Sequence, residues 1–333
     1  MIPAASGSRR PRVLLAAGPV GRLTPREAAV ALAHGFVDHA DVAVAGLAEG
    51  GPALGAALSE PEGELEVLSA GWVATADRLI AVGCDPEPVS DPLRASSAGL
   101  GRLVGYALQR RPLATEPSDH RVIIDLTGST SHDAGAGLLA ELASVRSLLA
   151  GVDLVGVVPP GQHQDRLLGL RGITSRKGRA LALSTDRMLA VDADLELFAK
   201  QTAPEFALVD GAGAAGGLGF ALLALGGRLA VGASETADRA GLDRALQRAD
   251  LVVTACDSFD FGSRGGGVVA ELAARCEAFE VPLVVISPVV GMSGREMRTL
   301  GVESAHPVDP GTGSADGLTR TARRLAEGWT PRW

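Results

Sequence analysis

The first fifty residues place a strand, a capped helix and a second strand in direct succession. The apolar run Arg12–Ala17 has the length of a buried strand, and Asp41–Leu47 follows as a second one. Between them, Thr24-Pro25-Arg26-Glu27 combines a threonine N-cap, a proline in the first turn and a glutamate three residues after the cap, the pattern of a capping box. A βαβ unit of this kind predicts an α/β fold with a parallel sheet and helices on its faces.

The rest of the chain divides into regular ends and an irregular, glycine-rich middle. Further strands are expected at Arg78–Val82, Arg121–Leu126, Asp153–Val158, Glu205–Val209, Arg228–Val231, Asp250–Thr254 and Pro282–Ile286. Helices are expected at Ala136–Leu149, Phe220–Leu225, Arg239–Arg248, Gly267–Phe279 and Ala315–Glu327. We therefore predict one α/β domain made of residues 12–65 and 236–330, a mixed α/β domain inserted at 66–235, and a disordered N-terminus at 1–11.

Charge and cysteine content exclude several classes of protein. The net charge of −8 opposes a nucleic-acid groove, which needs a basic surface. Three scattered cysteines, Cys84, Cys256 and Cys276, form neither a disulfide framework nor a zinc pattern. No apolar run approaches the ~20 residues of a membrane span, and residues 1–12 lack the apolar segment of a signal peptide. We expect a soluble, cytoplasmic protein with no nucleic-acid or membrane partner.

The first segment that can carry chemistry is a glycine-rich loop, Asp125-Leu-Thr-Gly-Ser-Thr-Ser-His-Asp-Ala-Gly-Ala-Gly137, between a predicted strand and a predicted helix. Free backbone N–H groups at the helix start, with the hydroxyls of Ser129 and Thr130, predict an anion site. Asp133 is a candidate for binding Mg²⁺ or accepting a proton. Its alternative role is that of a turn residue and N-cap. We expect His132 to be a loop histidine.

A second glycine-rich loop, Asp210-Gly-Ala-Gly-Ala-Ala-Gly-Gly-Leu-Gly219, contains the spacing Gly211-x-Gly213-x-x-Gly216 of dinucleotide-binding loops. Glu235 stands at a distance suited to a ribose contact, so a nicotinamide or flavin site is one alternative. Close packing of helix on strand without any ligand is another. Phosphate binding is the third, and it accounts for both glycine-rich loops.

A third loop, Thr254–Gly267, again connects a predicted strand to a predicted helix. Open α/β sheets bind their ligands at such strand ends. Asp257 and Asp260 are candidate acids, and Arg264 is a candidate partner for a phosphate. No Walker P-loop occurs, and the chain has only two lysines, Lys177 and Lys200.

In this order, the segments resemble those of type I glycerate kinases. Asp210–Gly219 is similar to the family's Gly-Ala-Gly-Ala-Ala-Gly-Gly-Met-Gly, and Thr127–Gly137 is similar to its Gly-Gly-Ser-Ala-Thr-Asn-Asp-Gly-Gly-Ala-Gly. Asp91–Gly101 resembles the family's Asp-Pro-Leu…Thr-Ser-x-Gly-x-Gly, and Leu167–Gly178 resembles a shortened form of a segment ending in Pro-Gln-Lys-Gly. Order and spacing agree from about Val13 to Val308, nearly the whole chain.

The resemblance implies a flavodoxin-like parallel-sheet domain formed by both chain ends, a second mixed α/β domain inserted into it, and a cleft between the two. It also implies ATP and Mg²⁺ as cofactors and phosphorylation of D-glycerate or a related small hydroxy acid. On this basis the partners are a glycerate-like substrate and a nucleotide. The implied catalytic residues are Asp133, Asp260 and Glu49, with Asp133 and Asp260 on the metal. The implied phosphate- and substrate-binding residues are Gly128, Ser129, Thr130, Ser97, Lys177, Gly211, Gly213, Gly216, Gly217 and Arg264.

Several charged positions of the family carry other residues in this chain. The family's Asp-Ser-Phe/Tyr-Lys falls on Ala17-Gly18-Pro19-Val20, and its Asp-Gly-Gly-Glu-Gly-Thr falls on Glu49–Leu54, where Pro52 replaces the glutamate. Its Gly-Glu-Gly-Arg-x-Asp falls on Ala255–Asp260, and a further lysine falls on Gly267. Phosphoryl transfer depends on such charges. The alternative is therefore a catalytically impaired paralogue that binds a nucleotide or a small organic acid without transferring phosphate.

Overall fold

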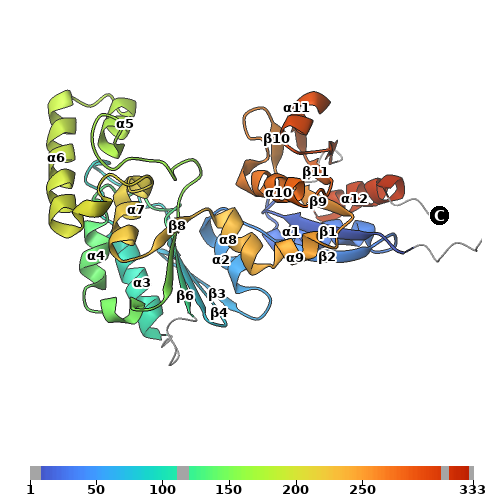
Figure 1. Ribbon diagram of the computed structural model, residues 1–333, viewed down its shortest axis with the longest axis horizontal. Helices are drawn as coiled ribbons and strands as arrows, with labels where there is room; N and C mark the ends of the chain where they lie inside the picture. The colour runs from blue at the N-terminus through green and yellow to red at the C-terminus, as the bar shows by residue number, and fades with distance from the viewer. Residues whose placement is uncertain (1–8, 111–119, 309–314, 330–333) are drawn as a thin grey trace, which may run out of the picture. The chain divides into compact units, whose positions relative to one another are not determined.

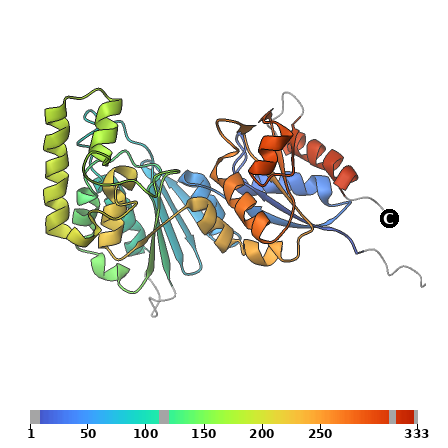
Figure 2. The ribbon, with the colours of Figure 1, turned by 45° about the horizontal axis from the view of Figure 1, so that its top comes forward.

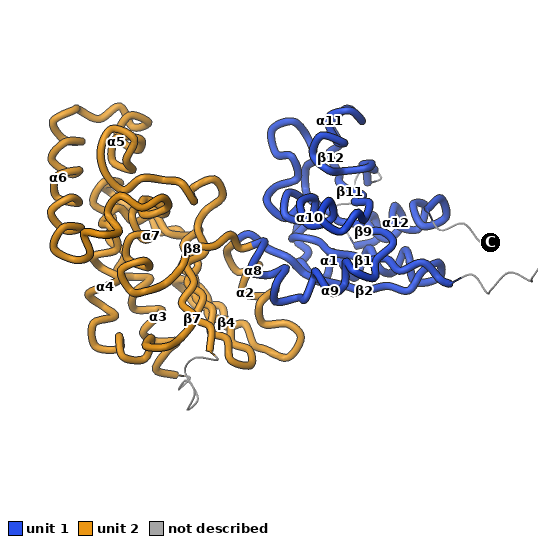
Figure 3. The backbone as a smooth tube through the Cα atoms, in the orientation of Figure 1, with its two compact units in different colours: residues 1–49, 233–333 blue, residues 50–232 orange. Residues whose placement is uncertain are grey.

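The computed structural model describes residues 9–110, 120–308 and 315–329. The chain forms two compact units, one of residues 1–49 and 233–333 and one of residues 50–232 (Figure 3). Most of the predicted disordered N-terminus, 1–11, lies outside the described residues. Residues 50–65, which we placed in the discontinuous domain, belong to the second unit, because the strand that begins at Glu64 pairs with Gly71–Ala76 of that unit.

The first unit contains a five-stranded, fully parallel sheet in the order β13-β11-β9-β1-β2. Its strands are β1 (Arg12–Ala17), β2 (Asp41–Gly46), β9 (Leu251–Ala255), β11 (Leu283–Ser287) and β13 (Ser304–Pro307). A separate parallel pair joins β10 (Ser258–Asp260) to β12 (Val289–Gly291). Numbered one to five in sequence, these strands are β1, β2, β9, β11 and β13. Their order across the sheet is then 2-1-3-4-5, which is the order of flavodoxin-like folds. The predicted fold class is thereby confirmed.

Helices cover both faces of this parallel sheet (Figures 1 and 2). They are α1 (Pro25–Phe36), α8 (Gly232–Arg239), α9 (Leu242–Leu246), α10 (Gly266–Ala278), α11 (Gly294–Thr299) and α12 (Ala315–Trp329). Along β1, Val13 and Leu15 belong to the core under α1 and α12, while Leu14 and Ala16 belong to the core under α8, α9 and α10. Because successive strand residues point to opposite faces, a strand covered on both sides is apolar throughout.

The predicted capping box at the start of α1 is confirmed. The Thr24 hydroxyl accepts a hydrogen bond from the backbone N–H of Glu27 at 3.3 Å, and the Glu27 carboxylate accepts one from the N–H of Thr24 at 2.8 Å. These bonds satisfy two donors that the first turn of a helix otherwise leaves unpaired. They fix where α1 begins above the sheet.

The second unit contains a mixed six-stranded sheet in the order β3-β4-β5-β6-β7-β8. Its strands are β3 (Glu64–Leu68), β4 (Gly71–Ala76), β5 (Leu79–Cys84), β6 (Arg121–Asp125), β7 (Asp153–Val157) and β8 (Arg228–Ala230). The first three strands are antiparallel neighbours, and the pairs from β5 to β8 are parallel. The carboxyl ends of β6 and β7 therefore open at the same edge of the sheet, where the first glycine-rich loop begins.

The helices of the second unit are α2 (Gly51–Ser59), α3 (Ala98–Arg110), α4 (Ala136–Leu142), α5 (Ile173–Ala180), α6 (Thr185–Thr202) and α7 (Ala214–Ala224). Two 3₁₀ turns, η2 (Arg146–Leu149) and η3 (Pro204–Phe206), complete it. One core joins α3, α4 and α7 to the parallel strands, and a second joins α5 and α6 to α7. Within the described residues, every helix is too short or too polar to cross a bilayer.

Three predicted elements are wrong. Glu205–Val209 is η3 followed by turns rather than a strand. Its Leu208 is 69% exposed, and β8 occupies the place beside β7. The predicted helix Ala136–Leu149 ends at Leu142, and Arg146–Leu149 is a 3₁₀ turn. The predicted helix Arg239–Arg248 is broken at Gly241, whose φ of 64° separates α8 from α9.

Candidate functional site

The first glycine-rich loop is anchored where it leaves β6. The Asp125 carboxylate is buried and accepts hydrogen bonds from the N–H of Thr127 at 2.9 Å and from the N–H of Gly51 at 2.6 Å. Burial raises the pKa of this carboxyl group, and the two N–H donors oppose that shift. Asp125 thus ties the loop to the start of α2.

Asp133 stabilises the other end of the same loop through hydrogen bonds to its carboxylate. Its Oδ2 atom accepts hydrogen bonds from the N–H of Ser97 at 2.8 Å, the hydroxyl of Ser97 at 2.9 Å and the N–H of Gly137 at 3.1 Å. Its Oδ1 atom accepts one from the N–H of Gly135 at 3.0 Å. A carboxylate has about four acceptor positions. Internal donors occupy four here, so this side chain holds the starts of α3 and α4 together.

Ser97, predicted to bind phosphate or substrate, is 2% exposed. Its hydroxyl donates to Asp133 and accepts a hydrogen bond from the N–H of Leu138 at 2.9 Å. Both of its hydrogen-bonding functions are therefore used within the protein wall. In the structure Ser97 supports the loop from behind.

The second glycine-rich loop packs directly against the first. Ala215, Gly216 and Gly217 all have positive φ, at 49°, 70° and 95°. A side chain on Gly216 would collide with the carbonyl oxygen of Ser131, and one on Gly217 would lie 2.5 Å from the Cα of Ala134. Close approach of two backbones requires these glycines. A dinucleotide-binding loop follows a strand, and the absence of a strand at 205–209 removes that context here.

The two loops and α5 enclose a cavity of ≈ 490 Å³ in the second unit. From the first loop it is lined by Thr127, Ser129, Thr130, Ser131 and His132, and from the second by Gly213, Ala215 and Gly216. The remaining lining residues are Pro159, Gln162, Asp165, Ile173, Arg176, Lys177 and Ala180. Five of the predicted binding residues meet here, namely Ser129, Thr130, Lys177, Gly213 and Gly216. Gly128, Gly211 and Gly217 lie in the same two loops outside the lining.

Cationic side chains enter this cavity from α5. Lys177 is half-buried, its Nζ lies 3.5 Å from the carbonyl oxygen of Thr130, and burial lowers its pKa. The guanidinium of Arg176 is paired with the carboxylate of Asp165. Neither Arg176 nor Asp165 was predicted from the sequence. The adjacent Arg176-Lys177 pair is the sequence signal that could have drawn attention to Arg176, and no local pattern indicates Asp165.

His132 forms part of the cavity wall. It is 2% exposed, and its Nε2 atom lies 3.0 Å from the hydroxyl of the buried Thr174. Burial, with the nearby charge of Lys177, lowers its pKa to about 4, although Asp91 opposes the shift. The imidazole is therefore neutral at pH 7. His132 lies in the loop, as expected, and it is buried there.

Three predicted site residues belong to the first unit. The Glu49 carboxylate accepts a hydrogen bond from the N–H of Gly267 at 2.6 Å, at the start of α10, where helix N–H groups favour a negative charge. Asp260 accepts hydrogen bonds from the Ser258 hydroxyl and from two backbone N–H groups, which lower its pKa to about 2. Arg264 has a φ of 50°, and its guanidinium lies 5.8 Å from the ring centroid of Phe261.

No group of three or more histidine, cysteine, aspartate and glutamate side chains with metal-binding spacing occurs among the residues that the structure describes. Mg²⁺ is commonly held by only one or two carboxylates together with phosphate oxygens and water. Asp260 suits that mode, because its Oδ2 atom accepts one hydrogen bond, from the Ser258 hydroxyl at 2.6 Å. Asp133 is less suited, because three donors already meet its Oδ2 atom and a fourth meets its Oδ1 atom.

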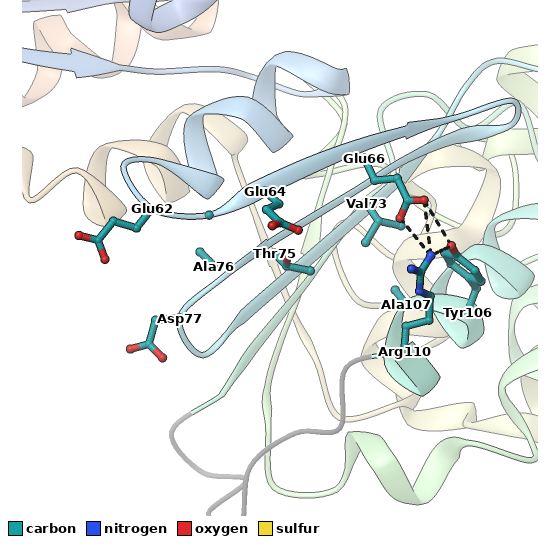
Figure 4. A pocket seen from close by; sticks show the side chains of 11 residues that line it. Glu62, Glu64, Glu66, Val73, Thr75, Ala76, Asp77, Tyr106, Ala107 and Arg110 are labelled. Atoms are coloured by element: carbon teal, nitrogen blue, oxygen red, sulfur yellow. Dashed lines mark hydrogen bonds and ion pairs between the residues drawn. The ribbon is translucent and has the colours of Figure 1, made fainter.

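The second unit has another hollow, of ≈ 570 Å³, whose charged lining is mainly acidic (Figure 4). It lies over β3, β4 and α3, and its acidic side chains are Glu62, Glu64, Glu66 and Asp77. Its one lining cation, Arg110, is engaged by Glu66 at 3.5 Å and lies 5.2 Å from the ring centroid of Tyr106. This hollow is unsuited to an anion, and none of the predicted site residues lines it.

The fold and the first cavity together define a two-unit α/β protein with a pocket of hydroxyls, backbone amides and cations. The family model described as the glycerate kinase family matches residues 163–330. A protein from Mycobacterium bovis that is described as uncharacterised is 30% identical, over 91% of this chain and 85% of its own length. A glycerate kinase from Bacillus subtilis is 25% identical, over 78% of this chain and 76% of its own length.

The crystal structure of a candidate glycerate kinase 2 from Salmonella typhimurium LT2 shares the fold, with a TM-score of 0.74 and 21% identity. The match covers 96% of this chain and 98% of that one. The chain belongs to the glycerate kinase family, which confirms the resemblance noted in the sequence. Membership supports a glycerate kinase-like phosphotransferase function.

Proposed function

We propose that this protein is an ATP-dependent kinase that phosphorylates D-glycerate, or a related small hydroxy acid, to its phosphate ester. The observation that carries the proposal is the ≈ 490 Å³ cavity between the two glycine-rich loops and α5. Its volume falls in the range of small-ligand sites, about 300–1,000 Å³. The ammonium of Lys177 and the backbone amides of the wall are donors suited to a carboxylate or a phosphate. The loop hydroxyls donate within the protein, Ser129 to Ser131, Thr130 to the Glu87 carbonyl and Ser131 to the Ala215 carbonyl, and would have to turn to meet a ligand.

Within this cavity, we assign charge compensation to Lys177 and orientation to the first loop. Phosphoryl transfer depends mainly on positioning and on stabilising charge that develops on phosphate oxygens. The Lys177 ammonium lies 3.5 Å from the carbonyl oxygen of Thr130 and lines the same cavity as Ser129 and Ser131. Arg176, held by Asp165, adds a second cation to the same wall. A substrate anion seated here would displace water from a half-buried ammonium.

Mg²⁺, when bound with the nucleotide, would neutralise charge on the phosphates. Within the first unit, we assign a Mg²⁺ contact to Asp260, which stays ionised because its pKa is lowered to about 2. Asp133 is assigned the role of holding the loop that carries Ser129 and Thr130. We assign Glu49 the role of accepting the hydrogen bond of the Gly267 N–H at the start of α10. The protein would act on soluble metabolites in the cytoplasm.

A second candidate function, binding without phosphoryl transfer, is favoured by one specific observation. The position at which relatives carry a lysine is Gly267, and the N–H of Gly267 donates to the carboxylate of Glu49. A negative charge thus occupies the helix start where related sequences place a positive one. Loss of a single well-placed charge typically costs ~3 kcal/mol in the barrier.

A coupled assay of ADP release with Mg-ATP and D-glycerate tests the first proposal, and the two lysines of the chain provide matched variants. We expect Lys177→Ala to lower kcat/KM about 100-fold and the exposed Lys200→Ala to leave it unchanged. Thermal-shift titrations with D-glycerate and with ATP accompany the assay. Ligand-induced stabilisation without ADP release would favour the second candidate. Equal activity of both lysine variants would contradict the assignment of Lys177.

A further inference from the structure

Helix α6 has apolar side chains on two opposite faces. The inner face, with Val191, Leu195 and Ala199, is buried in the core that joins α5, α6 and α7. On the outer face, Leu189 is 60% exposed and Leu197 is 57% exposed. In both ribbon views one side of α6 faces no other element of its unit (Figures 1 and 2). An amphipathic helix of a monomer normally presents polar residues on this side.

The outer face has a mirror-symmetric sequence. Counted from Ala193, leucines stand four residues away on either side, at Leu189 and Leu197, and opposite charges stand seven residues away, at Asp186 and Lys200. At 100° per residue, these five side chains lie within an arc of about 80°. All five are exposed. They form a single stripe along the helix, which we call the α6 stripe.

A mirror-symmetric stripe is complementary to an antiparallel copy of itself. In an isologous contact with its two-fold axis at Ala193, Leu189 of each chain meets Leu197 of the other, and Asp186 meets Lys200. The small side chain at the centre allows the helix axes to approach closely. Glu196, which pairs with Lys200 of its own helix at 2.6 Å, would face Ala190 of the second copy. Asp192 and Asp194 lie directly on either side of Ala193, about 100° around the helix from the centre of the stripe, and therefore flank the contact rather than enter it.

We propose that the α6 stripe is a homodimer interface in which α6 packs against α6 of a second copy in antiparallel orientation. Charge complementarity selects this occupant, because both ends of the stripe are matched by the same stripe reversed. A contact of one helix pair is smaller than the ~1,200 Å² of a standard interface. The dimer therefore forms reversibly, with a Kd on the order of 100 µM.

Sedimentation velocity of the full chain over a concentration series tests the proposal. We expect a monomer–dimer equilibrium that Leu189→Glu/Leu197→Glu abolishes, while Val67→Glu, at an equally exposed position on β3, leaves it unchanged. Circular dichroism of each variant verifies that it is folded. A protein that stays monomeric up to about five times the proposed Kd, or a dimer that survives the double leucine variant, would overturn the proposal.

Charge exchange tests the antiparallel geometry itself. Asp186→Lys and Lys200→Asp should each weaken dimerisation about tenfold at low salt, because each substitution appears twice in a two-fold interface. The double variant Asp186→Lys/Lys200→Asp recreates both opposite-charge pairs and should recover the wild-type Kd. A double variant that remains as weak as the single variants would overturn the two-fold arrangement at Ala193.

Discussion

The hydroxyl of Ser131 donates a hydrogen bond to the carbonyl oxygen of Ala215 at 3.2 Å, and this bond joins the two glycine-rich loops of the second unit. The N–H of Ala134 donates to the carbonyl oxygen of Gly216 at 3.3 Å, beside it. Residues more than eighty positions apart in the chain thus form one continuous wall. The glycines serve first to let two backbones meet, and the cavity is a consequence of that meeting.

Substituting Gly216 by alanine should lower the free energy of unfolding by more than backbone strain alone explains. A residue other than glycine at a φ of 70° costs about 1 kcal/mol, and the collision of the new side chain with the Ser131 carbonyl adds about 2 kcal/mol. Gly226 is the matched control, since its φ is 84° but nothing lies within 4 Å of the added atom. Urea unfolding of both alanine variants measures the difference. Equal destabilisation would contradict the packing account.

Ser97→Ala should lower the free energy of unfolding by about 2 kcal/mol, because it removes a buried donor to Asp133 and leaves the N–H of Leu138 without its acceptor. The neighbouring Ser96→Ala is the control. The Ser96 hydroxyl accepts a hydrogen bond from the N–H of Ala98 in an exposed position, so its loss should cost less than about 1 kcal/mol. A Ser97→Ala protein as stable as Ser96→Ala would show that Asp133 does not depend on this hydroxyl.

Much of the fold could be predicted because the parallel strands are buried on both faces and therefore appear as uninterrupted apolar runs. Strand β3, the outer strand of the hairpin with β4, was missed for the opposite reason. It carries Glu64 and Glu66 on an exposed edge, and Val67 is 68% exposed. Glu205–Val209 has the composition of a strand, but strand composition does not show that β8 already pairs with β7.

The candidate site was predictable only where its residues are adjacent in sequence. The first loop placed Ser129 and Thr130 together, and the resemblance to relatives added Lys177. Local patterns could not show that α5 carries Arg176 to the same cavity, or that Asp165 receives it. Nor does a pattern distinguish an aspartate that meets a ligand from one such as Asp133, whose oxygens are engaged by internal donors.

Stability of the second unit should fall as the pH is lowered from about 6.5 to about 4. His132 has a folded-state pKa of about 4, below its ordinary value of 6.5, so the unfolded chain binds more protons in this window. The contribution of His132 to the free energy of unfolding is fully present above pH 6.5 and is lost by about pH 4, and its size is on the order of 3 kcal/mol. Urea unfolding against pH measures it. His132→Gln should flatten this part of the profile, whereas the exposed His34→Gln should not.

Replacing Arg275 by alanine should destabilise the first unit more than replacing an exposed arginine does. Arg275 donates to Asp238 at 2.6 Å, Asp243 at 2.7 Å and Glu271 at 2.7 Å, and its side chain is only 15% exposed. Without the guanidinium, three carboxylates lie close together. Because they are partly exposed to solvent, we expect the free energy of unfolding to fall by only about 2 kcal/mol. Thermal unfolding of Arg275→Ala, compared with Ala at the exposed Arg295 of α11, measures this. Equal stability of the two variants would refute the network.

Gly267→Lys should raise kinase turnover if the replaced charge at this position limits the reaction. Gly267 has no positive φ, and an added Cβ would lie 2.8 Å from the Glu49 carboxylate, the movable end of a flexible side chain. The lysine can therefore be accommodated by displacing Glu49, which leaves a positive charge at the start of α10, the sign that the resemblance to type I glycerate kinases implies there.

Gly266→Lys provides the contrast, because Gly266 has a φ of 76° and a lysine there strains the backbone. Losing a charge-stabilising donor costs roughly 100-fold in rate, so restoring one should increase kcat by about 10-fold or more. ADP release with Mg-ATP and D-glycerate measures both variants. An increase confined to Gly267→Lys would show that the family's transfer chemistry persists and is held back at one position. Unchanged turnover in a folded Gly267→Lys protein would show that this position does not limit the reaction.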